Sequence, residues 1–405
     1  TIKDDFPKLI SFIEVEELEL LFILSYINKK ILLYSFALKA IYQNSFEKYI
    51  DKFLEELISF SINLRTSDIH IEQYKELVLF KFRIDGRLKT FFAFYSEFFK
   101  LISSYIKLIS NLDITQIRIP QDGRFSLNIE NKKYDFRVSS MPTLEAESIV
   151  LRILDNKNID KNLQTLGLSS NLLEILNQTL KLTQGLILIS GPTGSGKTTT
   201  LYSILQELNC EEKKIITVED PIEYKIDSIC QIPINSKIGL SFELVLKNIL
   251  RQDPDIIFIG EIRDKFSLDI ALQASLTGHL VIASIHANSA VETILRLVDL
   301  QADPFLISST LKLVMAQRLV LNYCKFCGAV GCTKCNYTKY YDRSTIAEVL
   351  KVDEKISSMI FKKSDINELK TYLENINFKT ILDDGKQKVE QNQTSLDEVY
   401  KVACF

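Results

Sequence analysis

The sequence predicts a protein of the α/β class, in which a larger α/β domain follows a smaller α+β domain. Three observations lead to this prediction. At 405 residues the chain is long enough for two or three domains. Apolar runs alternate with helical segments after residue 166, which is the order of a parallel sheet covered by helices. Alternating strand patterns and turns dominate residues 46–154, which is typical of an α+β domain.

Composition and charge exclude several classes of protein. Hydrophobic residues make up 46% and charged residues 25% of the chain, which fits a globular protein rather than a disordered or multispan membrane protein. The formal net charge of −3 at pH 7 gives no reason to expect nucleic-acid binding. The apolar region 18–42 is interrupted by Asn28-Lys29-Lys30, so neither half reaches the roughly 20 residues that span a bilayer.

The ends of the chain give little further information. No export signal is recognisable, which favours the cytoplasm. The sequence begins with Thr1 rather than Met, so an upstream segment can be missing. Residues 1–45 are predicted to be a helical segment without a chemical signature.

The segment 46–154 is predicted to fold as an α+β domain. A helical run covers residues 46–60. Strand-like alternation follows at 77–84 and 134–138, and turns are expected at Asp85-Gly86 and Asp122-Gly123. The polar stretch 155–165 has few apolar anchors and is predicted to be a linker.

The α/β domain is predicted to extend over residues 166–405. Its buried strands are expected at four apolar runs, residues 186–189, 215–218, 256–259 and 280–285.

A phosphate-binding loop follows the first of these strands. The pattern GxxxxGK[ST] is met by Gly191, Pro192, Thr193, Gly194, Ser195, Gly196, Lys197 and Thr198. It lies between an apolar strand and a helical run, as a P-loop requires. Backbone N–H groups and the helix N-terminus attract phosphate. We expect this loop and Thr199 to bind ATP, Lys197 to contact the β- and γ-phosphates, and Thr198 to bind Mg²⁺.

Carboxylates at the ends of two further strands are candidates for activating water. Glu261 follows the strand at 256–259, and Glu219-Asp220 follows the strand at 215–218. Ligands bind at the carboxyl ends of strands in such sheets. Glu261 is therefore the predicted general base, and Glu219 is expected to orient the water or the hydrated metal. Either residue alone has the alternative of a helix cap or a solvated loop position.

Two of the three histidines bracket the last strand. His279 precedes it and His286 follows it. Both are candidates for sensing the γ-phosphate, although a single histidine is more often structural.

Four cysteines predict a zinc site. Cys324, Cys327, Cys332 and Cys335 form two CxxC pairs, the spacing of a tetrahedral Zn²⁺ site. The alternative is reduced cysteines without metal. Cys210, Cys230 and Cys404 are scattered, which argues against a disulfide framework.

These motifs together resemble the ATPases of type II secretion and type IV pilus assembly. The Walker A, Asp-box, Walker B and His-box motifs of that family match residues 191–202, 218–224, 250–264 and 274–279, in the same order. The resemblance continues upstream through residues 65–72, 82–87, 120–124 and 135–140.

The resemblance implies a PAS-like domain at 46–154, a RecA-like ATPase domain that includes a tetracysteine element at 321–345, and a homo-hexameric ring whose domains rotate during ATP turnover. Arginines matching Arg137 and Arg152 would close over the nucleotide, and Arg251 matches a further arginine. Guanidinium groups stabilise charge on a transferred phosphoryl. Each could equally be a surface ion-pair partner.

The family also implies partners. These are an inner-membrane platform protein and a membrane-anchored cytoplasmic partner, with the chain peripheral to the inner membrane. Pilus-retraction ATPases generally lack the tetracysteine element, which favours assembly or secretion. A secretion pseudopilus, a pilus and a DNA-uptake fibre stay open as systems.

One position departs from the family pattern and another from the wider P-loop pattern. Lys247 stands where the family usually has an arginine. Gly260 stands where many P-loop enzymes have a magnesium-binding aspartate, a substitution that the family itself shows. Two other functions stay open, a nucleotide-binding scaffold without turnover and a ring DNA translocase.

Overall fold

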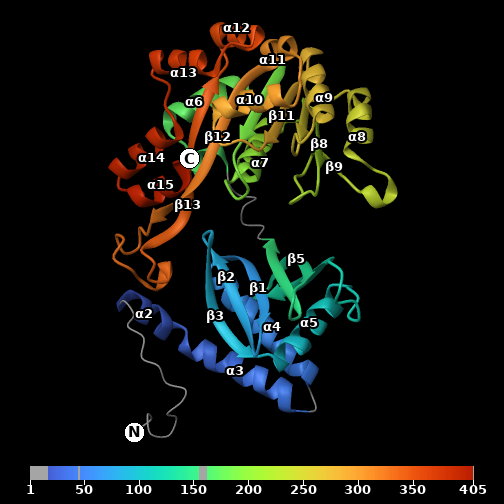
Figure 1. Ribbon diagram of the computed structural model, residues 1–405, viewed down its shortest axis with the longest axis vertical. Coiled ribbons are helices and arrows are strands. Elements are labelled where there is room, and N and C mark those ends of the chain that lie inside the picture. The colour runs from blue at the N-terminus through green and yellow to red at the C-terminus, as the bar shows by residue number, and fades with distance from the viewer. Residues whose placement is uncertain (1–16, 44–45, 155–161, 405) are drawn as a thin grey trace. The chain divides into compact units, whose positions relative to one another are not determined.

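The computed structural model describes residues 17–43, 46–154 and 162–404 (Figure 1). Its contacts divide the chain into two compact units. The first comprises residues 1–155 with Tyr323–Asp342, and the second comprises Asn156–Asn322 with Arg343–Phe405. The predicted segment 1–45 lies partly outside the described residues.

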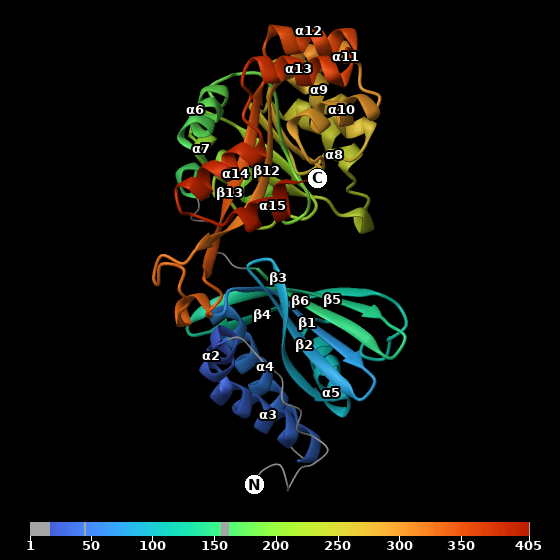
Figure 2. The ribbon, with the colours of Figure 1, turned by 60° about the vertical axis from the view of Figure 1, so that its left-hand side comes forward.

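The first unit is an antiparallel sheet with helices on one face. The sheet has six strands in the order β3-β2-β1-β6-β5-β4, and α3, α4 and α5 lie on one side of it (Figure 2). Buried phenylalanines such as Phe53, Phe80 and Phe98 fill the space between helices and strands. The elements are α2 (Glu17–Ser25), α3 (Ile27–Tyr42), α4 (Phe46–Asn63), β1 (Thr66–Tyr74), β2 (Leu77–Ile84), β3 (Arg87–Tyr95), α5 (Glu97–Ile109), β4 (Gln121–Ile129), β5 (Lys132–Pro142) and β6 (Glu147–Leu154).

The α+β prediction is confirmed, with one local error. Asp85 and Gly86 have φ angles of 49° and 87° and form the tight turn between β2 and β3, as expected for a two-residue hairpin loop. Asp122 and Gly123, however, are strand residues of β4. A Cβ at position 123 would lie 2.7 Å from the Ser110 carbonyl oxygen, so this glycine permits a close backbone approach rather than a turn.

The second unit is a sheet with helices on both faces (Figure 1). Its order is β13-β12-β7-β11-β10-β8-β9, and the pairings of β7, β8, β9, β10, β11 and β12 are parallel. Its strands are β7 (Gly185–Ser190), β8 (Ile215–Glu219), β9 (Cys230–Pro233), β10 (Ile256–Ile259), β11 (Leu280–Ile285), β12 (Leu311–Tyr323) and β13 (Tyr340–Lys351). All four predicted strands are confirmed.

Helices cover both faces of this sheet because its central strands are apolar on both sides. In β7, Leu186 and Leu188 enter one core, while Ile187 and Ile189 enter the other, as period-two alternation requires. The helices are η2 (Leu163–Leu166), α6 (Ser170–Thr179), α7 (Lys197–Leu208), η3 (Ser236–Ile238), α8 (Phe242–Ile249), η4 (Leu250–Gln252), α9 (Lys265–Leu276), α10 (Ala290–Asp299), α11 (Pro304–Thr310), α12 (Glu354–Lys362), α13 (Ile366–Asn375), α14 (Ile381–Glu390) and α15 (Leu396–Ala403).

Two boundaries differ from the sequence expectation. The 3-10 helix η2 (Leu163–Leu166) runs from the end of the expected linker, 155–165, into the expected ATPase domain. Residues 155–161 lie outside the described part of the chain. The tetracysteine segment Tyr323–Asp342 groups by its contacts with the first unit, although sequence order places it within the ATPase domain. In the parts that the structure describes, no helix has the length and apolar character needed to cross a membrane.

Candidate active site

The P-loop connects the end of β7 to the start of α7 by a backbone path that requires glycine. Gly191 and Gly194 have φ angles of 149° and 79°, and a Cβ at Gly191 would lie 2.5 Å from Ser195 Oγ. Helix α7 begins at Lys197, so its N-terminal N–H groups and its dipole both favour an anion at this loop. The residues fit a nucleotide phosphate.

Lys197 is folded over the loop. Its Nζ donates to the carbonyl oxygens of Gly191 at 2.6 Å and Pro192 at 3.1 Å. Burial lowers the pKa of Lys197 to about 8, and the nearby Glu261 partly opposes this. The next residue, Thr198, is exposed, so its hydroxyl is available to a hydrated Mg²⁺.

Glu261 lies at the same edge of the sheet as the P-loop. It follows β10 and is held on both sides, because His286 Nε2 lies 3.0 Å from Oε1 and Arg263 Nε lies 2.7 Å from Oε2. Its side chain is 21% exposed, so water can reach it. The structure thus brings the predicted base, Glu261, together with one of the two candidate histidines, His286.

His279 and Arg251 do not join this cluster within one chain. His279 precedes β11, and the first residues of β11 pair with the first residues of β7. Because the P-loop follows the end of β7, His279 lies at the opposite edge of the sheet. Its Nδ1 contacts the Ala274 carbonyl oxygen at 3.0 Å, which is a local structural contact. Arg251 is exposed in η4, before β10, and its Nη2 donates to Asn248 Oδ1.

Glu219 is buried and accepts three side-chain hydrogen bonds. It is 4% exposed and accepts from Tyr202 OH, from Thr217 Oγ1 at 2.6 Å and from Gln231 Nε2 at 3.3 Å. These contacts bind both carboxylate oxygens to neighbouring elements, which fits a positioning role for Glu219 better than direct orientation of water. The next residue, Asp220, is exposed and is the carboxylate of this pair that faces solvent.

Gly260 departs from the common P-loop pattern for a steric reason. A Cβ at this position would lie 3.1 Å from the Val218 carbonyl oxygen and 3.4 Å from Glu219 Cα. An aspartate would therefore press against the backbone of β8.

The first unit presents its arginines in a row across the sheet. Arg137 pairs in register with Arg152 on one side and with Arg124 on the other, and cross-strand partners share a face. Asp68 is the register partner of both Arg152 and Arg83. The sequence analysis identified Arg137 and Arg152 as site residues but not Arg124, Arg83 or Asp68. The alternation of polar with buried residues along their strands could have indicated that they share a face.

Asp68 fixes one end of this row. It is 6% exposed, and its carboxylate accepts from Arg152 Nε at 2.8 Å and from Ser67 Oγ at 2.8 Å. Arg83 Nε lies 3.7 Å away. The Arg152 side chain is 60% exposed, so a buried carboxylate orients an arginine whose end faces outward.

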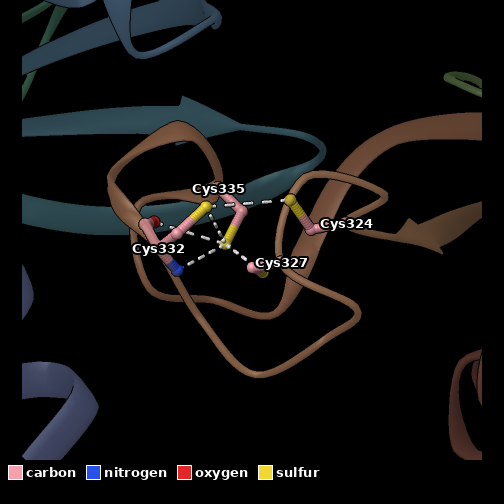
Figure 3. A group of neighbouring side chains, drawn as sticks. All are labelled: Cys324, Cys327, Cys332 and Cys335. Carbon is pink, nitrogen blue, oxygen red and sulfur yellow. Dashed lines mark hydrogen bonds between the residues drawn. The ribbon is translucent and has the colours of Figure 1, made fainter.

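The four cysteines of the tetracysteine segment converge (Figure 3). Their Sγ atoms all lie within 4.8 Å of one another, with separations of 4.0 Å for Cys324–Cys332, 3.9 Å for Cys327–Cys335 and 3.8 Å for Cys332–Cys335. Tetrahedral Zn²⁺ with bonds of about 2.3 Å places its sulfurs about 3.8 Å apart. The backbone N–H of Gly331 also donates to Cys327 Sγ at 3.3 Å. The residues fit a zinc ion.

Comparison with known proteins agrees with this geometry. The model of the Type II/IV secretion system protein family matches residues 43–401. The chain belongs to this family. Among curated members, it is 40% identical over 378 residues to the type II secretion system ATPase E of Vibrio cholerae, covering 87% of this chain and 75% of that protein. It is 39% identical over 378 residues, with the same coverage, to the type II secretion system protein E of Aeromonas hydrophila.

Solved structures of secretion and pilus ATPases share the fold. The Legionella pneumophila ATPase DotB has a TM-score of 0.69 at 26% identity, with 86% of this chain and 95% of that chain covered. The pilus retraction motor PilT has a TM-score of 0.61 at 27% identity, with 87% and 97% covered. The prediction of the family is confirmed, and as a member of it this chain is an ATPase of secretion or pilus systems.

Proposed function

We propose that ATP hydrolysis by this chain drives the assembly of a type II secretion pseudopilus or a type IV pilus-like fibre at the cytoplasmic membrane. The proposal depends mainly on the placement of Glu261, which lies at the sheet edge that bears the P-loop and contacts His286 at 3.0 Å. The chain that carries this site is 39–40% identical to type II secretion proteins. Identity to the retraction motor is lower, at 27%, which favours assembly over retraction.

Each residue of the site has a role in this proposal. The P-loop residues from Gly191 to Thr199 hold the phosphates, and Lys197 neutralises the β- and γ-oxygens. Mg²⁺, bound through Thr198, would spread the charge of the phosphates. Glu261 accepts a proton from the attacking water, and the contacts of His286 and Arg263 fix the direction of its two oxygens.

The assembly is proposed to be a cytoplasmic homo-hexamer. It would act with an inner-membrane platform protein and a membrane-anchored cytoplasmic partner. In that ring, Arg137 and Arg152 approach the nucleotide and stabilise charge on the transferred phosphoryl. The four cysteines hold Zn²⁺ as a structural ion.

Paired substitutions at Lys197 and Glu261 test hydrolysis. Lys197→Ala removes the charge that faces the phosphates and is expected to weaken ATP binding and abolish turnover. Glu261→Gln keeps binding, while kcat falls by about 10²–10⁴ because the general base is lost. Radiolabelled ATP turnover beside nucleotide-binding titration measures both effects. Unchanged turnover in Glu261→Gln would refute the assignment of the base.

Complementation separates the remaining functions. Expression in a secretion-deficient strain that lacks its own ATPase is expected to restore export with the unmodified chain and not with Glu261→Gln. A nucleotide-binding scaffold would restore export in both cases. A DNA-uptake motor would restore transformation and leave export unchanged.

A further inference from the structure

We infer that Gln317 and Arg318, consecutive residues of β12, are positioning residues that couple the P-loop to the loop carrying His286. This inference rests on the proposed function, because it assigns His286 a task at Glu261. It adds two residues that the sequence motifs do not include.

Gln317 and Arg318 are buried polar residues in an otherwise apolar part of β12. Gln317 is 0% and Arg318 is 4% exposed, and Ala316 before them and Val320 after them are buried. Successive side chains of a strand point to opposite faces. The pair therefore directs an amide to one face of the sheet and a guanidinium to the other.

Gln317 contacts the P-loop. In the parallel pairing of β12 with β7, Ala316 lies opposite Ser190, the last residue of β7. Gln317 is thus level with the start of the loop, and its Nε2 donates to the Ser195 carbonyl oxygen at 2.9 Å. A Cβ at Gly196 would lie 3.2 Å from the same nitrogen, so the amide packs directly against the loop backbone.

The amide of Gln317 is retained at a cost to stability. Within the described parts of the chain, its Oε1 is a buried atom with no hydrogen-bond partner. A buried acceptor without a donor is unfavourable, so packing alone favours methionine or leucine here. What glutamine adds is the N–H that reaches Ser195.

Arg318 reaches in the other direction, to the residue beyond β11. Strands β12 and β11 flank β7 on opposite sides, so they are two strand spacings, about 10 Å, apart. Arg318 Nη2 donates to the Asn288 carbonyl oxygen at 3.1 Å and to Asn288 Oδ1 at 3.2 Å. Its Nη1 donates to the Gln317 carbonyl oxygen at 3.0 Å. A lysine at this position has the charge but not the planar fork.

The contacted loop carries the residue that orients Glu261. Asn288 is two positions after His286, whose Nε2 lies 3.0 Å from Glu261 Oε1. The loop has other anchors, since Asn288 N donates to Glu292 at 3.0 Å and Ala290 N donates to Glu348 at 2.5 Å. Arg318 differs from them because its neighbour in sequence touches the P-loop. A shift of the Ser195 carbonyl is therefore passed through β12 to Asn288 and His286.

Hydrogen exchange with and without Mg-ADP tests this coupling on the full chain. Mg-ADP is expected to slow exchange in the unmodified chain at residues 191–198 and also at 286–290. In Arg318→Lys, the slowing at 191–198 persists, while the slowing at 286–290 is lost and kcat falls about tenfold, the effect of one net hydrogen bond. In Gln317→Met, the Kd of Mg-ADP rises about tenfold.

Two further variants make the outcome decisive. Asn288→Ala removes one acceptor of Arg318 at an exposed position and is expected to repeat the effect of Arg318→Lys. Gln178→Met, at an exposed glutamine of α6, is the matched control and should behave as the unmodified chain. The coupling would be overturned if Mg-ADP slowed exchange at 191–198 and also, to the same extent as in the unmodified chain, at 286–290 in both Arg318→Lys and Asn288→Ala. Absence of protection at 191–198 in the unmodified chain would instead overturn the nucleotide site itself.

Discussion

Lys197 and Glu219 illustrate how burial decides the chemistry of a charged residue. Glu219 is buried with three hydrogen-bond donors around it, so its carboxylate serves to hold α7, β8 and β9 together. Lys197 is half-buried beside carbonyl oxygens, and this burial lowers its pKa to about 8. Its charge is therefore sensitive to pH near 8.

Nucleotide binding is predicted to depend on pH through Lys197. Below pH 8 the amine is mostly protonated and binding is at full strength. Phosphate oxygens favour the charged form and raise the pKa, so binding between pH 8 and the unperturbed value of about 10.4 takes up a proton. Affinity for ADP should fall by up to about tenfold per pH unit above 8.

Calorimetry at pH 7 and pH 9, in buffers of different ionisation enthalpy, measures this proton uptake. Lys197→Arg, which stays charged, is the control and should show no uptake. Equal affinities at both pH values without proton uptake in the unmodified chain would contradict the prediction.

At the scale of elements, strand register creates the arginine row of the first unit. Arg124, Arg137 and Arg152 come from β4, β5 and β6 and are neighbours only because their strands pair in this register. Asp68 of β1 completes the arrangement by accepting from Arg152. A slip of one residue in any pairing would move an arginine to the phenylalanine-filled face.

Asp68→Asn is predicted to lower turnover about tenfold, because a neutral amide holds Arg152 less firmly than a carboxylate. The same substitution should have no further effect in an Arg152→Ala background, since its effect acts through that arginine. Steady-state ATPase assays of the two single variants and the double variant measure this. Asp135→Asn, a neighbouring surface carboxylate on β5, is the matched control. Multiplicative losses in the double variant would exclude the positioning role of Asp68.

The tetracysteine segment is a second example of elements brought together by long-range contacts. Tyr337 packs against the core of the first unit, and the Arg65 guanidinium lies 4.1 Å from the centre of the Tyr341 ring. Arg65 Nη1 also donates to the Lys334 carbonyl oxygen at 3.1 Å. A metal that orders this loop therefore also orders a surface of the first unit.

The purified chain is predicted to contain about one zinc ion per molecule. Replacing both Cys332 and Cys335 by serine should remove it and lower the unfolding temperature of the full chain, because zinc binding contributes folding free energy. Elemental analysis and thermal unfolding provide the two measurements. The exposed pair Cys210 and Cys230, replaced in the same way, is the control. If the chain, isolated without chelators, contained no zinc, the prediction would be wrong and the four cysteines would be ordinary reduced thiols.

Much of the second unit could be predicted from the sequence because its signals are local. The P-loop pattern, the apolar strands and the position of Glu261 after β10 all lie within short segments. The position of His279 could also have been predicted, because a residue that precedes a parallel strand lies at the opposite edge of the sheet from one that follows it. The contacts of Glu219 with Tyr202 and Gln231 could not be predicted from the sequence, since they depend on how distant segments pack.

At the scale of the whole molecule, we propose that residues of both units take part in one reaction. In the proposed mechanism, the second unit contributes the P-loop, Glu261 and His286, and the first contributes Arg137 and Arg152. These arginines stand on the sheet of the first unit. They act on ATP only if they approach a nucleotide bound by the second unit during turnover, which is the central claim.

The most direct test is the turnover number of Arg137→Ala and Arg152→Ala, measured beside Mg-ADP affinity in the same preparations. If the arginines stabilise the transferred phosphoryl, each substitution lowers kcat by about 10³ or more, while Mg-ADP affinity changes little. Lys133→Ala, which removes an exposed cation from the same hairpin, should leave kcat within about twofold. Turnover of both arginine variants equal to that of Lys133→Ala would contradict the account, because the first unit would then take no part in the chemistry.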